Sequence, residues 1–121
     1  MTASERRRKE RACHPAAAEN LAHYVIVRAD LSRGVQSANI VHAAGESSPG
    51  NLPDGTIAVC LTAPNEEALR TFEAKLASAG VAFRSIVETD GPHAGQLMAI
   101  GAVPGRKEDL RKHFSSLPLL R

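Results

Sequence analysis

The sequence predicts an α/β fold in which a mixed four-stranded sheet carries helices on both faces. Three observations support this class. Short apolar runs typical of strands alternate with segments of helical periodicity, these segments follow the order β-α-β-α-β-β-α, and the last two strands are close enough in the chain to form an antiparallel hairpin. The chain has 121 residues, of which 43% are hydrophobic, so it is long enough for one domain with a buried core.

The sequence of residues 23–62 predicts a strand, a helix and a second strand. Residues 23–30, HYVIVRAD, contain a nearly continuous β-branched and aromatic run, as in a strand that is covered on both faces. A turn through Gly34 leads into a helix over 35–46, and a loop rich in Pro, Gly and Ser over 47–55 ends it. Residues 56–62, TIAVCLT, form the second apolar strand.

The helix over 35–46 has two distinct sides when residues are placed at about 100° intervals. Small and apolar residues share one side, which we expect to lie close against the sheet: Ala38, Ile40, Val41, Ala44 and Gly45. Polar residues share the other side: Gln36, Asn39, His42 and Glu46.

The sequence of residues 64–114 predicts a helix, a two-stranded hairpin and a closing helix. The segment 64–67 supplies a helix cap and negative charge, and the helix that follows ends before Gly80. Strands over 81–88 and 96–103, joined by a loop, form the hairpin, and a short charged helix covers 105–114.

The net positive charge of the chain comes from its N-terminus. Residues 1–22 carry five basic and three acidic residues, whereas residues 23–121 carry ten of each and are neutral. We expect 1–22 to be a flexible basic arm and 23–121 to be the single domain. Attraction to phosphates would therefore come from the arm or from local clusters of the domain.

Cysteine content and hydropathy argue against several classes. Cys13 and Cys60 lie far apart without a CxxC or Cys/His pattern, so we expect neither a disulfide framework nor a zinc site. We also expect no cofactor. Because no apolar run approaches the roughly 18 residues of a membrane span, we expect a cytoplasmic protein with no membrane contact. Aromatic residues make up only 3% of the chain, which disfavours stacking on single-stranded nucleic acid.

Candidate functional side chains follow two of the predicted strands, where an α/β sheet gathers binding and catalytic groups. A carboxylate, Asp90 or Glu88, beside His42 suits general-base catalysis on water, because it orients the imidazole and stabilises its charged form. Alternatively, His42 lies on a solvated helix face and the Asp90 segment is only a turn. The candidate catalytic residues are His42 and Asp90, and the candidate substrate-binding residues are Arg28, Asp30, Arg33, Asn39, Glu46, Thr89 and His93.

Three segments of residues 23–118 resemble the type II peptidyl-tRNA hydrolases, as a divergent bacterial-type member would. YVIVRADLSRGVQSANIVHAAGES is similar to the family's opening strand, loop and helix, which carry Arg-x-Asp-Leu, a Gly turn and Gln-x-x-His-Ala-Ala. TAPNEEALRTFEAKLASAGV is similar to its Ala-Pro-Asp-Glu helix, and GQLMAIGAVPGRKEDL to its closing strand, turn and helix. In the first segment the matching residues are Arg28, Asp30, Leu31, Gly34, His42, Ala43 and Ala44.

The resemblance implies a cytosolic, metal-free homodimer that hydrolyses the ester between a peptide and the 3′ ribose of tRNA, and so recycles tRNA in translation. The chain departs from the family in three places. Lysines that suit tRNA phosphates normally follow the Gly turn, whereas residues 35–37, Val-Gln-Ser, follow it here. Asn39 stands where the family has Gln, and the segment 88–93 replaces a longer Asp-Ala-Gly-x-Thr loop.

For this activity we expect Asp90, together with His42, to activate or position water against the ester carbonyl. Asn39 and N–H groups of the loop would hold the oxyanion, and Arg28, Arg33 or the N-terminal arm would hold the acceptor end of peptidyl-tRNA. The absent lysines and the neutral domain leave two alternatives: a non-catalytic binding module on the same fold, and a hydrolase of another small ester or amide.

Overall fold

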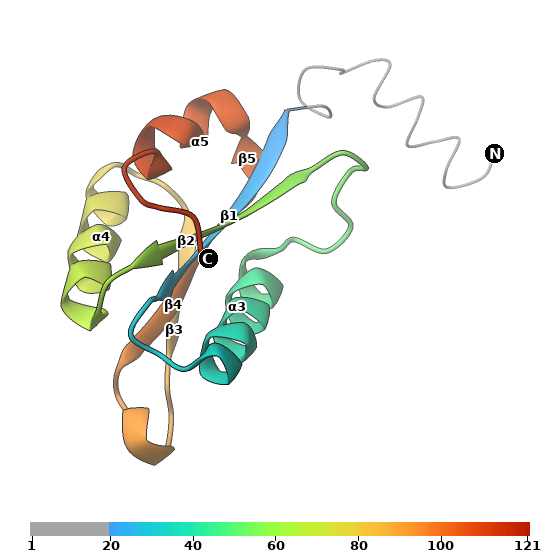
Figure 1. The fold of residues 1–121 in the computed structure, drawn as a ribbon. Helices are drawn as coiled ribbons and strands as arrows, with labels where there is room; N and C mark the ends of the chain where they lie inside the picture. Colours follow the sequence, from blue (N-terminus) through green and yellow to red (C-terminus); the bar gives the residue numbers. More distant parts are fainter. Residues whose placement is uncertain (1–19) are drawn as a thin grey trace.

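A mixed sheet of five strands lies at the centre of residues 20–121, the part of the chain that the computed structural model describes (Figure 1). The four longer strands are β1 (Leu21–Arg28), β2 (Ile57–Ala63), β3 (Phe83–Val87) and β4 (Leu97–Ala102). They are ordered β2-β1-β4-β3, with β2 parallel to β1 and β4 antiparallel to both β1 and β3. The α/β class, the order of the longer elements and the β3-β4 hairpin agree with the sequence prediction.

The predicted four-stranded sheet lacks one short strand. β5 (Gly105–Arg106) pairs antiparallel with the first two residues of β1, although 105–106 were predicted to begin the closing helix. β1 starts at Leu21 rather than at 23, and its paired positions with β4 are Val25 to Val27, so its first residues are free to pair with β5. Residues 21 and 22 of the predicted arm therefore belong to β1, and its residues 1–19 lie outside the described residues.

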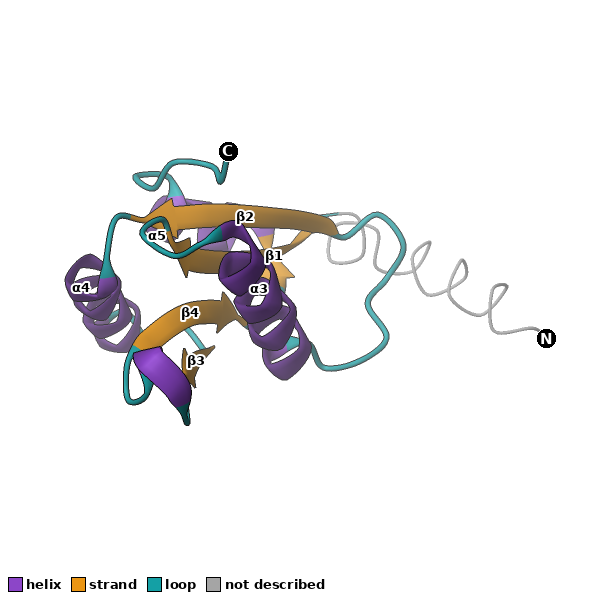
Figure 2. Cartoon of the chain, turned by 60° about the horizontal axis from the view of Figure 1, so that its bottom comes forward, coloured by secondary structure: helices purple, strands orange, loops and turns teal. Residues whose placement is uncertain are grey.

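Helices cover both faces of the sheet, as predicted. The helix α3 (Arg33–Ser47) packs against β1, β3 and β4 on one face. The helices α4 (Glu66–Ser78) and α5 (Lys107–Phe114) lie on the other, and Figure 2 shows α3 in front of the strands with α4 apart from it. Because side chains alternate along a strand, Tyr24 of β1 packs with α4 and α5 while Val25 packs with α3.

The ends of α4 follow from the sequence around it. Asn65 caps its first turn, where the side-chain Oδ1 accepts a hydrogen bond of 2.9 Å from the Ala68 N–H. Glu66 and Glu67 place negative charge at the same end, which favours the helix dipole. Gly80 has a φ of 73°, a left-handed conformation that glycine adopts without strain, and the helix stops just before it.

The largest part of the core lies between the sheet and the helices α4 and α5. Phe114 at the end of α5 stacks on Tyr24 of β1 with ring centroids 4.4 Å apart, and the tilted ring of Phe72 lies 5.6 Å from Phe114. Leu69 and Leu76 of α4 are fully buried in the same cluster. These contacts fix α4 and α5 on the face opposite α3.

The side of α3 that meets the sheet agrees only in part with the predicted side. Ile40 and Ala44 pack against the core as predicted, whereas Val41 is 72% exposed. The buried residues of the helix are Gln36, Asn39, Ala43 and Ser47. The buried polar side chains are satisfied within the protein. The Gln36 amide donates to the Arg28 carbonyl at 3.0 Å, and the Ser47 hydroxyl donates to the Ala43 carbonyl at 2.6 Å. Hydrogen bonds within the protein therefore allow polar residues of α3 to be buried against the sheet.

Gly101 of β4 is the reason that α3 can approach so closely. A Cβ atom at this position would lie 2.3 Å from the Ala43 carbonyl oxygen and 2.4 Å from Ser47 Oγ. Only a residue without a side chain fits beneath this part of α3.

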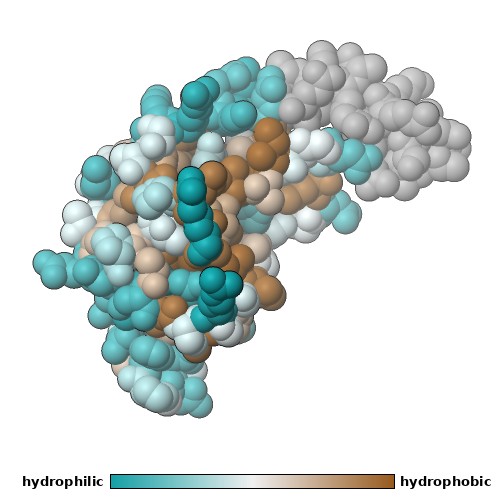
Figure 3. All heavy atoms as spheres, viewed as in Figure 1, coloured by the Kyte–Doolittle hydropathy of each residue, from teal (hydrophilic) through white to brown (hydrophobic). Residues whose placement is uncertain are grey.

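Several large hydrophobic residues face solvent in the described part of the chain. Figure 3 shows apolar surface on the face that carries α3 and β2. The most exposed large hydrophobics are Val41, Ile57, Val87 and Leu119. In β2, Cys60 is half-buried, and burial raises the pKa of its thiol. None of the helices within residues 20–121 combines the length and apolar character that a bilayer crossing requires.

Candidate functional site

A pocket of about 350 Å³ lies between α3 and the end of β3. Asn39, His42 and Glu46 of α3 line it on one side. Residues 85–89, from Ser85 in β3 to Thr89 in the loop that follows, line it on the other. Four of the predicted site residues, Asn39, His42, Glu46 and Thr89, therefore meet in one pocket.

Helix geometry presents His42 to this pocket. Asn39 lies three residues before it and Glu46 four residues after it, and side chains at these spacings share one face of a helix. The His42 side chain is exposed, and its ring makes no hydrogen bond or ion pair with any residue from 20 to 121. Both ring nitrogens are therefore available to water or to a ligand.

Asn39 contributes an amide group that already makes one hydrogen bond within the protein. Its side chain is only 4% exposed, and Nδ2 donates a hydrogen bond of 2.9 Å to the Val35 carbonyl one turn earlier in α3. An amide nitrogen carries two hydrogens, so this contact leaves one further donor. Asn39 can thus be held rigidly by the helix and still donate to an oxygen atom.

The carboxylates of the pocket come from Glu46 and Glu88, and Asp90 is not among the lining residues. The loop after β3 explains this difference from the prediction. The Glu88 N–H donates to the Gln96 carbonyl at 3.0 Å and the Gly95 N–H donates to the Glu88 carbonyl at 2.8 Å, so the loop is closed at Glu88. Asp90 lies beyond this closure, directly before the short 3-10 helix η1 (Gly91–His93).

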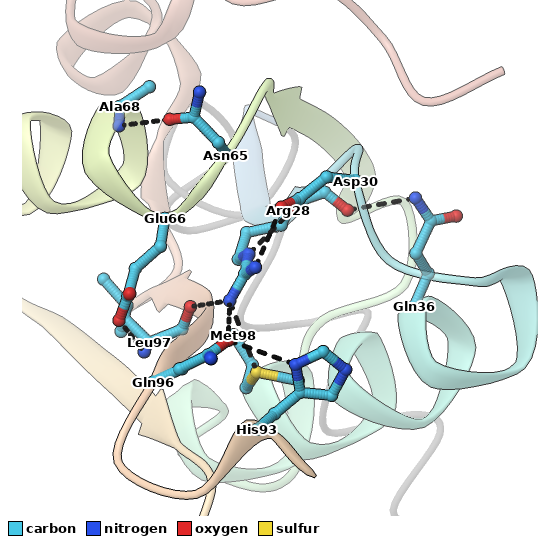
Figure 4. A network of polar contacts seen from close by, with 10 residues as sticks. All are labelled: Arg28, Asp30, Gln36, Asn65, Glu66, Ala68, His93, Gln96, Leu97 and Met98. Atoms are coloured by element: carbon cyan, nitrogen blue, oxygen red, sulfur yellow. Dashed lines mark hydrogen bonds and ion pairs between the residues drawn. The ribbon is translucent and has the colours of Figure 1, made fainter.

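Arg28 at the end of β1 forms the centre of a second polar cluster (Figure 4). Its guanidinium donates from Nε and Nη2 to the two carboxylate oxygens of Asp30 at 2.9 and 2.8 Å. Nη1 donates to Gln96 Oε1 at 2.8 Å and also reaches the Leu97 carbonyl at 3.3 Å. Arg28 is 6% exposed. Nε, Nη1 and Nη2 each contact protein atoms, so Arg28 holds the end of β1 in place, and its substrate-binding role stays a prediction.

The charges of this cluster support one another. Hydrogen bonding from Arg28 lowers the pKa of the Asp30 carboxyl, and the charges of Arg28 and His93 lower it further, against the opposing effect of burial. Hydrogen bonding to Asp30 in turn raises the pKa of Arg28, to which the charge of Glu66 adds a smaller contribution. Glu66 Oε2 accepts a hydrogen bond of 2.7 Å from the Leu97 N–H and so joins α4 to β4 beside the cluster.

Gln96, which was not among the predicted site residues, connects Arg28 with His93, two predicted residues that are distant in the chain. Its Oε1 lies 2.8 Å from Arg28 Nη1 and 3.1 Å from His93 Nδ1. Arg28, Asp30 and His93 are thereby gathered in one cluster, separate from the residues that line the His42 pocket. Arg33, the exposed first residue of α3, belongs to neither group.

The pocket around His42 is acidic. Its ionisable lining residues are His42, Glu46 and Glu88, and neither Lys nor Arg lines it. Within residues 20–121, no group of three or more His, Cys, Asp and Glu side chains is arranged to hold a metal ion. The pocket therefore offers two carboxylates, one amide, one imidazole and the hydroxyl groups of Ser85 and Thr89.

Comparison with known proteins does not assign a family. The sequence matches no protein-family model, and a search of curated proteins finds no significant match.

Proposed function

We propose that the protein hydrolyses the ester bond of peptidyl-tRNA, with the pocket around His42 as its active site. One observation carries the proposal: the α3 segment that resembles the type II peptidyl-tRNA hydrolases brings Asn39, His42 and Glu46 against Glu88 and Thr89 after β3. These are the two segments from which the sequence predicts the catalytic groups.

In the proposed reaction His42 acts as the general base. Its imidazole accepts a proton from water while the water oxygen attacks the ester carbonyl carbon. The tetrahedral intermediate then releases the 3′ ribose oxygen, which takes the proton back from the imidazolium as the C–O bond breaks. Glu46 lies one helical turn from His42 on the same face of α3, and Glu88 takes the place that the sequence assigned to Asp90.

Asn39 supplies the donor for the oxyanion. The amide hydrogen that is not given to Val35 is the only side-chain N–H donor of the pocket besides the imidazole. An amide held by a helix and by its own hydrogen bond needs little reorganisation when charge develops on the carbonyl oxygen.

The acidic lining limits which part of the substrate enters the pocket. Glu46 and Glu88 repel phosphate groups, but their oxygens accept hydrogen bonds from hydroxyl groups such as the ribose 2′-OH. The terminal ribose and the ester therefore occupy the pocket, while the tRNA phosphates lie outside it. This agrees with the absence of lysines after the Gly34 turn. Phosphate contacts then fall to basic residues outside the pocket, such as those of the N-terminal segment.

One hydrolysis assay tests the proposal. The purified full chain is incubated with N-acetyl-aminoacyl-tRNA and, in parallel, with a nitrophenyl ester of the same N-acetyl-amino acid, with a known peptidyl-tRNA hydrolase as positive control. Release from tRNA supports the proposal, and cleavage of the simple ester alone would instead indicate a hydrolase of small esters. No release from either substrate, under conditions where the control is active, overturns it.

A non-catalytic binding module is the second candidate, and one observation favours it. Among residues 20–121, no carboxylate forms a hydrogen bond with the His42 ring, as the partner of a catalytic imidazole usually does. Equilibrium binding of deacylated tRNA, measured over a range of salt concentrations together with the hydrolysis assay, separates the two. Salt-dependent binding without turnover would identify a binding module. The homodimer that the resemblance implies is a further prediction, which light scattering of the full chain tests.

A further inference from the structure

His93 lies at the end of η1, outside the pocket of His42, with one side of its ring in contact with the protein. Its Nδ1 lies 3.1 Å from Gln96 Oε1, and the ring is half-buried. A neutral imidazole has one nitrogen that carries a proton and one that does not, and its neighbours decide which is which. The partners of Gln96 therefore determine what chemistry His93 can offer.

Arg28 fixes the orientation of the Gln96 amide. The oxygen and nitrogen of an amide are nearly the same size, so the group can be placed in either of two orientations. An arginine side chain has only donors, so the Gln96 atom that faces it has to be the oxygen. Nη1 of Arg28 lies 2.8 Å from Gln96 Oε1. The same oxygen is the atom that faces His93 Nδ1. Because this oxygen cannot donate, the hydrogen of the second bond has to come from His93 Nδ1.

The arginine that sets this orientation is itself held by protein contacts. It is buried, and Asp30 holds it through two hydrogen bonds of 2.9 and 2.8 Å. The backbone of the loop is held as well, because the Gln96 N–H donates to the His93 carbonyl at 2.9 Å. A chain of contacts thus runs from Asp30 through Arg28 and Gln96 to His93 (Figure 4).

We propose that this chain holds neutral His93 in the Nδ1–H tautomer, so that its Nε2 is a fixed acceptor for a hydroxyl group or a water molecule. In Figure 4 the second ring nitrogen of His93 points away from Gln96. Nε2 can accept a hydrogen bond or a proton there. His93 is then a second base of the molecule, independent of His42 and of the proposed hydrolysis. Arg28 and Gln96 are its positioning residues.

The tautomer can be measured without a substrate. Free histidine favours the Nε2–H form, so the two-bond ¹H–¹⁵N spectrum of ¹⁵N-labelled full chain at a pH where the ring is neutral distinguishes the alternatives. We expect His93 to show a protonated Nδ1 and an unprotonated Nε2. A predominantly Nε2–H ring, or an average of the two forms, would overturn the proposal.

Two substitutions at Gln96 form a matched pair. Q96L removes the acceptor, and the loss of one neutral hydrogen bond should shift the tautomer population of His93 roughly fivefold toward Nε2–H. Q96E keeps two oxygen acceptors for Arg28 and His93, so the Nδ1–H form should persist. An unchanged tautomer in a folded Q96L protein would show that Gln96 does not set it. If Q96L does not fold, Q96E and the wild-type spectrum still decide the question.

The accessibility of Nε2 has its own test. Diethyl pyrocarbonate acylates unprotonated imidazole nitrogens, and mass spectrometry locates the modified residue. We expect His93 to react, with the ¹⁵N spectrum of the adduct showing the new bond at Nε2. Failure of His93 to react while the exposed His42 does would show that Nε2 is closed, and would contradict its role as an acceptor.

Discussion

His23 Nε2 lies 2.7 Å from Ser47 Oγ, which ties the start of β1 to the last residue of α3 in the interior. The Ser47 hydroxyl has a single hydrogen and donates it to the Ala43 carbonyl at 2.6 Å, so His23 has to be the donor in the other bond. His23 is only 8% exposed. The pair joins two polar side chains beside Gly101 and satisfies both without a charge.

Stability should fall in mildly acidic solution because of His23. Burial lowers its pKa below the ordinary value of 6.5, so the folded protein binds fewer protons than the unfolded chain as the pH drops below that value. The free energy of unfolding therefore decreases with decreasing pH until the folded-state pKa is passed. Urea unfolding at a series of pH values between 8 and 5 checks this prediction.

A matched variant isolates the contribution of His23. In H23Q the amide can still donate to Ser47 Oγ but does not titrate, so the variant should lose less stability than the wild type over the same pH range. Other groups titrate equally in both proteins. Identical pH dependence of the two would show that His23 is not responsible.

Gly101 should not tolerate even one additional methyl group. In G101A the Cβ would meet the Ala43 carbonyl oxygen at 2.3 Å, and relief of this clash requires α3 to move away from β4. We expect a loss of about 1–3 kcal/mol in the free energy of unfolding. G45A in the same helix is the control, because its Cβ would meet nothing within 4 Å and should stabilise the helix by up to about 1 kcal/mol. Equal destabilisation by both substitutions would mean that close packing of α3 is not the cause.

Replacement of Arg28 by lysine should destabilise the protein. R28K keeps the charge but loses the planar fork that binds both oxygens of Asp30 and reaches Gln96, so buried acceptors are left without partners. We expect a loss of about 1–3 kcal/mol in thermal or urea unfolding. NMR titration should also show the pKa of Asp30 rising toward its ordinary value.

The control for this substitution is R33K at the exposed first residue of α3. It should change the free energy of unfolding by no more than about 0.5 kcal/mol. If R28K were equally mild, the contacts of Arg28 would not hold the end of β1.

The long elements of the fold could be predicted because their signals are local. The β-branched run of β1 and the Asn65 cap of α4 each act within a few residues. β5 could not be predicted, because its two residues form a strand only through their pairing with Leu21 and Ala22. The buried side of α3 was only partly predicted for a related reason. It depends on Gly101, a distant residue that makes room for Ala43 and Ser47.

In the candidate site, too, the features set by local spacing could be predicted and those set by distant contacts could not. Helical spacing was enough to place Asn39, His42 and Glu46 on one face, and the position after β3 was enough to bring Thr89 toward them. The hydrogen bond that closes the loop between Glu88 and Gln96 leaves Asp90 outside the pocket. No local sequence pattern predicts this closure. Gln96 was missed because its role depends on its contact with Arg28, which lies 68 residues earlier in the chain.

The most direct measurement of the proposed activity compares H42A with V41A in the hydrolysis of N-acetyl-aminoacyl-tRNA. Both residues are exposed neighbours on α3, but only His42 lines the pocket, so neither substitution should change stability by more than about 0.5 kcal/mol. We predict that H42A lowers kcat/KM by about 100-fold or more, as loss of a general base does, while V41A retains wild-type turnover. Wild-type turnover in H42A would contradict the assignment of this pocket as the active site.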